Sequence, residues 1–424
     1  MEQQVGTSLS QIGDFMRGAG AKAPPPGAPS EETAPDRFTG SDAREATELA
    51  TFKIPPFPEE GWIDWEFFID GVQRTVVCGI VSIDNLEVPI HIAHLVAGAM
   101  RRTNRRLKPY RILEALVLML PLGALRARDL RWSGRTPPGR ELSHRGRIYD
   151  LVRAGGPLYT DTSVSLVEFQ AGTPRRLLEA GDLVRTGAIR DKALNRSRAL
   201  LRVLELSLLW RVRTEHPEAW VLLDGPVAPL LKYDRLVDPQ LDGLKDIADP
   251  SSAFDFYRRV VGAVKNVEII PQQGLEVALS SGDFLVVPTY QFSEIIKDED
   301  GVARQMISAF MWLRRELASE ISALWSSVSG LIRLDIPIAA LVDEGLRSTW
   351  VNALEEGLLN LNNPDSTEAA QLNSILITAA VERWPVPQVA PQRMLTEFYP
   401  IAETERWLSS TLRPSPELAN ILNL

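Results

Sequence analysis

The sequence contains a single cysteine, Cys78, and only four histidines among its 424 residues. One cysteine excludes an internal disulfide and a cysteine-based zinc site, and four scattered histidines argue against a histidine-rich metal cage. No apolar run is both long enough and free enough of charge to cross a bilayer. No signal peptide is expected, because Glu2 follows the first residue and no apolar stretch comes after it. These absences predict a soluble protein with no membrane contact, and a bacterial or archaeal cytoplasm fits best.

Nucleotide-binding and hydrolase motifs are lacking as well. The chain has no Walker A sequence, no glycine-rich dinucleotide motif and no nucleophile elbow for Ser-His-Asp catalysis. If ATP hydrolysis accompanies this protein's activity, a partner must supply it.

Charge is distributed unevenly along the chain. Residues 101–147 carry thirteen arginines or lysines against three acids, within a chain of net charge −9. Because the whole chain has 46 basic and 55 acidic residues, 33 basic and 52 acidic residues remain elsewhere. Such segregation can create a local positive field on an acidic protein and favours nucleic-acid contact. A solvated, arginine-rich insertion explains the same pattern.

The first 50 residues differ in composition from the rest. Residues 18–47 are rich in proline, glycine and small polar residues, which predicts a linker. Before it, apolar residues at helical spacing between Val5 and Met16 predict a short amphipathic helix. We expect residues 1–50 to be a flexible segment with a candidate docking helix, although a frayed terminus is the alternative. The tail from Ser415 to Leu424 is a second candidate docking peptide.

The order of the expected elements predicts the fold class. Strands are expected at 65–70, 75–80 and 88–97, and a basic, turn-rich insertion at about 100–190. A long helix at 191–214 leads directly into a strand at 219–223. A β-meander followed by a helix and another strand predicts an α/β, RNase H-like mixed sheet flanked by helices, formed by residues 51–424. Further strands are expected at 259–265, 284–287 and 331–337, and further helices at 303–325, 341–360 and 368–381.

Three acids are candidates for a functional site. Asp70 and Asp224 each follow an apolar strand and precede a glycine, and Glu205 lies among leucines in the long helix. Carboxylates aimed from strand ends can hold a hard divalent cation. The alternatives are tight Asp-Gly turns at both strand ends, and a solvated pair of Glu205 with the arginines that share its helical face.

Other polar residues support weaker hypotheses. Asp335 lies on an expected strand, where it could assist such a site or pair with Arg333 on the same sheet face. His91 and His94 would face opposite sides of a strand, so one is expected to be buried and the other exposed.

Taken in order, these segments resemble the NurA nuclease family. The resemblance rests on residues 68–74, the helix with Glu205, residues 222–227, and residues 260–265, which end in Lys265. It covers roughly Phe57 to Glu403, without most of residues 100–190. It implies an RNase H-like homodimeric nuclease that processes 5′ ends of DNA beside HerA, a hexameric ATPase that translocates duplex DNA. The settings would be DNA end resection in repair or defence against phage.

The resemblance also implies roles for individual residues. Asp70, Glu205 and Asp224 match the family's catalytic and metal-binding acids, which would hold Mn²⁺ or Mg²⁺, with two ions per site. Lys265 matches a lysine that could bind a phosphate, and a surface lysine is the alternative. The charge segregation, rather than the resemblance, motivates one more hypothesis. Two copies would form a funnel for DNA, and basic residues near its mouth would contact the substrate, namely Arg101, Arg102, Arg105 and Arg106.

The chain departs from the family near its end. The family has a late Tyr-Pro followed about eight residues later by a histidine. We matched this stretch to Trp384-Pro385, which places Gln392 where the histidine would be. Tryptophan can stack on a base but lacks the phenol, and glutamine cannot shuttle a proton. A catalytically weak or inactive adaptor that guides DNA for the motor is therefore the alternative to a nuclease.

Overall fold

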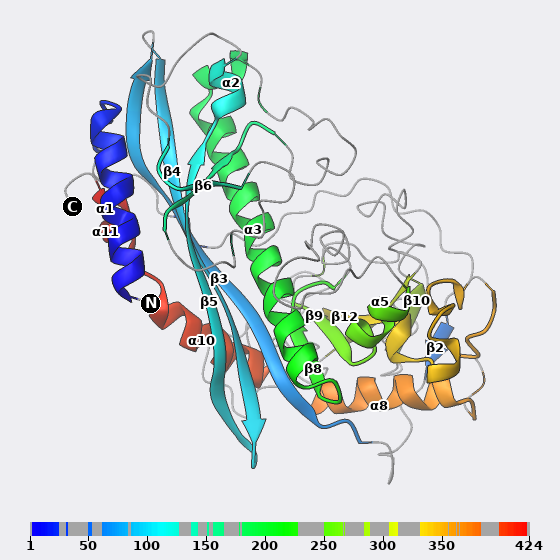
Figure 1. Ribbon diagram of the computed structural model, residues 1–424. Helices are drawn as coiled ribbons and strands as arrows, with labels where there is room; N and C mark the ends of the chain where they lie inside the picture. The colour runs from blue at the N-terminus through cyan, green and yellow to red at the C-terminus, as the bar shows by residue number, and fades with distance from the viewer. Residues whose placement is uncertain are drawn as a thin grey trace, which may run out of the picture.

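Three long antiparallel strands dominate the computed structural model (Figure 1). β3 spans Trp65–Ile83, β4 spans Leu86–Thr103 and β5 spans Arg106–Leu120, and they pair in chain order as a meander. β4 is buried on both faces from residue 88 to residue 100. Its run of valine, isoleucine, alanine and leucine fits this position, because a strand covered on both sides needs apolar residues at every position rather than at alternate ones.

The described part of the chain covers most, but not all, of the sequence. It comprises residues 2–24, 31–32, 50–52, 62–83, 86–126, 137–142, 151, 156–164, 178, 180–227, 250–265, 267, 284–288, 305–312, 331–354, 356–361, 363, 365–382 and 398–421. No helix within these residues is long and apolar enough to cross a membrane.

The meander belongs to a larger mixed sheet. In the described residues this sheet has 12 strands in the order β2-β10-β11-β12-β9-β8-β3-β4-β5-β7-β6, with β1 beside β3. β8 (Trp220–Asp224) runs parallel to β3, and β9 (Val260–Val264) runs parallel to β8. The central order β5-β4-β3-β8-β9 is therefore the RNase H-like plan that the sequence predicted. The other strands are β1 (Glu31–Glu32), β2 (Ala50–Phe52), β6 (Arg140–Glu141), β7 (Leu158–Asp161), β10 (Phe284–Pro288), β11 (Met306–Trp312) and β12 (Leu331–Pro337).

Helices cover both faces of the meander. α3 (Thr186–Glu215) crosses one face, and α1 (Glu2–Gly18), α10 (Tyr399–Thr411) and α11 (Ser415–Ala419) lie on the other (Figure 1). α3 contains no proline and is rich in leucine, alanine and arginine, which are strong helix formers. The remaining helical elements are α2 (Leu122–Arg126), α5 (Pro250–Tyr257), α8 (Thr367–Val381), η3 (Ala180–Val184), η8 (Ile338–Ala340), η9 (Glu344–Leu346) and η10 (Trp350–Asn352).

The two terminal helices share one apolar cluster. Leu9, Ile12 and Met16 of α1 are buried against the far half of the meander together with Leu418 and Ile421. Gly13 permits this approach, because a Cβ there would lie 2.5 Å from the carbonyl oxygen of Ile421. The helix that the sequence analysis treated as a docking peptide thus buries its apolar side against its own chain.

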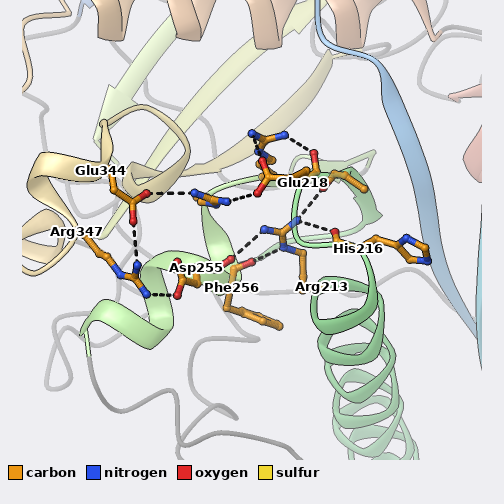
Figure 2. Close-up of polar contacts among 10 residues, drawn as sticks. Arg213, His216, Glu218, Asp255, Phe256, Glu344 and Arg347 are labelled. Atoms are coloured by element: carbon orange, nitrogen blue, oxygen red, sulfur yellow. Dashed lines mark hydrogen bonds and ion pairs between the residues drawn. The ribbon is translucent and has the colours of Figure 1, made fainter.

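A buried arginine near the end of α3 binds the main chain of the segments that follow it. Arg213 donates hydrogen bonds to the main-chain oxygens of Ala219 at 2.8 Å, Asp255 at 2.9 Å and Phe256 at 3.1 Å (Figure 2). Burial, together with the nearby charges of Arg258 and Arg259, lowers the pKa of Arg213 to about 10. These bonds join α3, the residue before β8 and α5.

Several predicted boundaries are wrong. Gly71 does not end a strand, because β3 continues through it to Ile83. The helix predicted at 303–325 begins instead as β11, a buried apolar run whose periodicity does not separate a central strand from a helix. Short 3-10 turns replace the helix predicted at 341–360. The expected insertion starts too early, because residues 100–120 complete β4 and form β5.

Candidate functional site

Asp70 occupies the middle of β3 and is almost fully buried, with 3% of its surface exposed. Its Oδ1 accepts a hydrogen bond from the Gly71 N–H at 2.7 Å, and its Oδ2 has no hydrogen-bond partner among the described residues. Burial raises the pKa of the Asp70 carboxyl well above its ordinary value. The charge of Asp224 raises it further, Lys265 lowers it, and Glu405 and Glu205 raise it again. The ionised form of Asp70 is therefore unfavourable in this position unless a positive charge lies beside it.

Gly71 lets α3 approach the strand beside Asp70. A Cβ at position 71 would lie 2.2 Å from Oε1 of Glu205, so any larger residue would displace that carboxylate from its present position. Glu205 is 2% exposed, and its Oε2 is 2.6 Å from a guanidinium nitrogen of Arg202. The Arg-Glu pair considered in the sequence analysis exists, but Glu205 is buried against β3 rather than solvated.

Asp224 is the last residue of β8, the strand that runs parallel to β3. Ile69 of β3 pairs with Leu223 of β8, and each of these residues is followed by one of the two aspartates. Oδ2 of Asp224 is 3.1 Å from Nζ of Lys265, and Oδ1 is buried without a hydrogen-bond partner in the described chain. The structure thus brings together Asp70 of β3, Glu205 of α3, Asp224 of β8 and Lys265, which directly follows β9.

A further acid, Glu405 of α10, was missed by the sequence analysis. Its charge acts on the pKa of Asp70. α10 lies against β3 and β4 at Gly98, the partner of Asp70 across the ladder. The signal for this helix was Tyr399-Pro400, the one Tyr-Pro pair in the sequence, which starts α10. Trp407 stands eight residues after this tyrosine, so the family's histidine is lacking in this match too.

The four arginines proposed to bind DNA fall into two groups. Arg101 pairs with Glu66 at 2.6 Å and lies over the ring of Phe67. Arg102 donates two hydrogen bonds of 2.5 Å to Glu382. Both arginines therefore have acidic partners within this chain.

The second group is at the tip of the hairpin between β4 and β5. Arg105 and Arg106 are exposed there, and Asn104 and Arg105 take the positive φ angles of a tight turn. Their exposed side chains are thus available to a partner.

Trp384 and Gln392, the other two residues proposed to bind substrate, lie outside the described residues.

The remaining candidates are structural. Asp335 is fully buried and accepts hydrogen bonds from Arg333 at 2.7 Å and Ser308 at 3.2 Å, as the alternative reading of this acid expected. His91 and His94 are both buried, which corrects the expectation that one is exposed. Burial lowers the pKa of His91 to about 4, so it is neutral at physiological pH. His94 instead contacts Glu114 at 2.7 Å.

The oxygen donors of the site suit a hard divalent cation. Oδ2 of Asp70 and Oδ1 of Asp224 are buried without hydrogen bonds in the described chain, and burying a carboxylate oxygen in this way is costly. As the side chains stand, no three acidic, histidine or cysteine groups among the described residues form a ready-made metal cage. By donor type, the two oxygens without partners, Oδ2 of Asp70 and Oδ1 of Asp224, are the atoms here that could bind a cation, whereas Glu205 is paired with Arg202.

Known proteins give weak matches to this chain. No protein-family model and no curated protein matches it. Among solved structures it is similar to the crystal structure of the NurA nuclease from Sulfolobus solfataricus, with 12% sequence identity and a TM-score of 0.28. That match covers 78% of this chain and 81% of the other. A TM-score this low does not by itself establish a shared fold, so the site is assigned from the residues of this chain.

Proposed function

We propose that the protein is a divalent-metal-dependent deoxyribonuclease that hydrolyses phosphodiester bonds of DNA. The observation that supports this most strongly is the pair of buried carboxylate oxygens without partners, one from Asp70 and one from Asp224. Asp70 on β3 and Asp224 at the end of β8 are two of the acids to which the sequence resemblance gives this role, and Glu205 is the third. Mn²⁺ or Mg²⁺, with two ions per site, is the proposed cofactor.

Each residue of the site has a distinct role in this proposal. Bound ions would activate a water and stabilise the leaving 3′ oxygen. Asp70 and Asp224 supply ligand oxygens from adjacent strands, so the sheet itself sets their spacing. Lys265 neutralises one oxygen of Asp224 and is 18% exposed, so its ammonium group can also meet a phosphate at the edge of the site.

The β4–β5 hairpin provides a second contact for DNA. Its tip lies about 24 Å from Asp70, taking seven residues of extended strand at about 3.4 Å each. The exposed Arg105 and Arg106 would contact the phosphate backbone there, which contributes affinity without reading sequence. DNA bound at the hairpin would then extend along the sheet toward the carboxylates.

The proposed partners follow from the sequence resemblance. They are a second copy of this chain and a HerA-like hexameric ATPase, and the proposed activity is the processing of 5′ ends during end resection or phage defence. The described terminal segments, α1 and α11, pack together, so docking through either would use their outer sides or require their release.

A DNA-guiding adaptor without strong catalysis is the second candidate. The observation that favours it is the lack of the family's histidine, whether the late Tyr-Pro is matched to Trp384 or to Tyr399. Such an adaptor would bind DNA through Arg105 and Arg106 but would leave it intact.

Cleavage of end-labelled single- and double-stranded DNA in Mn²⁺ tests the proposal. The intact protein should cleave, Asp70→Asn should not, and Asp191→Asn, an exposed acid on α3, should cleave like the intact protein. Each protein is assayed with and without the HerA-like ATPase and ATP. DNA left intact in every one of these reactions would reject the nuclease in favour of the adaptor.

A further inference from the structure

Arg202 bridges two parts of the candidate site. One of its terminal nitrogens donates to Oε2 of Glu205 at 2.6 Å and to the main-chain oxygen of Asp224 at 3.1 Å. The side chain comes from α3 and is 22% exposed. A single positive group therefore contacts one expected ligand directly and the backbone of another.

The backbone after β8 is shaped around this guanidinium. Gly225 has a φ of +87°, a conformation that favours glycine. A Cβ at position 225 would lie 2.6 Å from one terminal nitrogen of Arg202 and 2.9 Å from the other. The Asp224-Gly225 pair thus ends the strand and also makes room for Arg202 beside the site.

We propose that Arg202 is an internal cation that holds Glu205 in the metal-free protein and yields it when a divalent ion binds. This inference depends on the proposed function. Asp70 and Asp224 each keep a buried oxygen without a hydrogen bond in the described chain, whereas Glu205 has a partner at 2.6 Å. Arg202 therefore supplies the positive partner of Glu205, the expected ligand that comes from α3 and packs against β3 at Gly71.

The electrostatics make the two cations competitors. A guanidinium and a divalent ion repel each other, and both require the carboxylate of Glu205. Leaving a buried carboxylate unpaired is costly, so Glu205 needs one of them at all times. The bond to the Asp224 carbonyl keeps Arg202 near while Glu205 changes partner. Arg202 is thus a positioning residue that lowers metal affinity in exchange for an ordered metal-free site.

Calorimetric titration of MnCl₂ into chelator-treated full-length protein tests this inference. Arg202→Gln should bind Mn²⁺ several-fold more tightly than the intact protein, because the competing charge is gone. Its thermal midpoint without metal should fall, because Glu205 loses its partner. Arg211→Gln, an exposed arginine on the same helix, is the matched control and should change neither quantity.

Two further variants keep the test decisive. Arg202→Lys retains a positive charge if the glutamine variant does not fold. Because an ammonium group lacks the planar fork of the guanidinium and holds Glu205 less firmly, we expect Mn²⁺ affinity above that of the intact protein, by less than for Arg202→Gln. In the Glu205→Gln background, Arg202→Gln should no longer tighten binding. Saturable binding by the intact protein with equal or weaker binding by both Arg202 variants would overturn the inference alone. No binding by any of these proteins would overturn the proposed function as well.

Discussion

Gly98 lies directly across the β3–β4 ladder from Asp70, and Leu408 of α10 occupies the space that a side chain there would need. A Cβ at position 98 would be 2.3 Å from Cδ2 of Leu408 and 2.8 Å from Cζ3 of Trp407. The glycine therefore lets α10, which carries Glu405, rest on the strand beside the candidate site.

Gly98→Val should push α10 away from the sheet. Forcing carbon atoms into a packed contact costs about 1–3 kcal/mol, and we expect a loss of unfolding free energy in that range. Urea unfolding measures it, with Gly181→Ala as the control because a Cβ there meets nothing within 4 Å. If Gly98→Val is as stable as the control, α10 does not pack on the strand as described.

Gly71 and Glu205 should show energetic coupling. Gly71→Ala places a methyl group where Oε1 of Glu205 lies, so we expect a destabilisation of about 1–3 kcal/mol. In the Glu205→Ala background the same change should cost less, because the obstructing carboxylate is gone. A double-mutant cycle measured by urea unfolding gives the difference. Additive effects of the two changes would argue against the contact.

The raised pKa of Asp70 predicts how stability depends on pH. The folded state holds the Asp70 proton more tightly than the unfolded state, whose value is near 3.8. The contribution of Asp70 to stability is therefore fully present below that value and is lost as pH rises through the folded pKa.

Asp70→Asn removes this loss, because the amide stays neutral and keeps an oxygen for the Gly71 N–H. Without metal, the variant should be more stable than the intact protein at pH 7, because the amide carries no charge to bury. The gain should vanish toward pH 4. Asp335→Asn is the control and should destabilise, because Asp335 has hydrogen bonds from Arg333 and Ser308. Thermal unfolding in a chelating buffer would contradict the account if Asp70→Asn were the less stable protein at pH 7.

DNA affinity should depend on the hairpin tip. Arg105→Glu combined with Arg106→Glu should weaken binding and reduce the slope of log affinity against log salt by about 1 for each phosphate that the protein no longer neutralises. Arg211→Glu, on the outside of α3, changes charge equally per residue and should have little effect. Fluorescence anisotropy over a salt series measures both quantities. An unchanged slope in the hairpin variant would remove the hairpin from the binding surface.

The order of elements was the part of the fold that could be predicted well. The strand-rich start, the long helix and the short strand ending at Asp224 are strong local patterns, and the structure confirms them as β3, α3 and β8. β11 could not be predicted in the same way, because a strand buried on both faces lacks the alternation that marks a half-exposed strand.

The site was predicted less completely than the fold. Spacing alone left Glu205 as a solvated partner of arginine, because its burial depends on Gly71, which is 134 positions away in the sequence. Asp-Gly at residues 70–71 resembled a turn signal, yet its glycine provides clearance for α3 inside a continuous strand. Glu405 could not be found from local pattern, because the register that brings α10 onto Gly98 is set by tertiary packing.

Titration of Mn²⁺ into the metal-free protein, beside Asp70→Asn and Asp224→Asn, tests the carboxylate site most directly. The account predicts saturable binding by the intact protein and its loss, or a large weakening, in both variants. Binding of equal strength in all three proteins, or none in the intact protein, would contradict the proposal that Asp70 and Asp224 together hold a divalent cation.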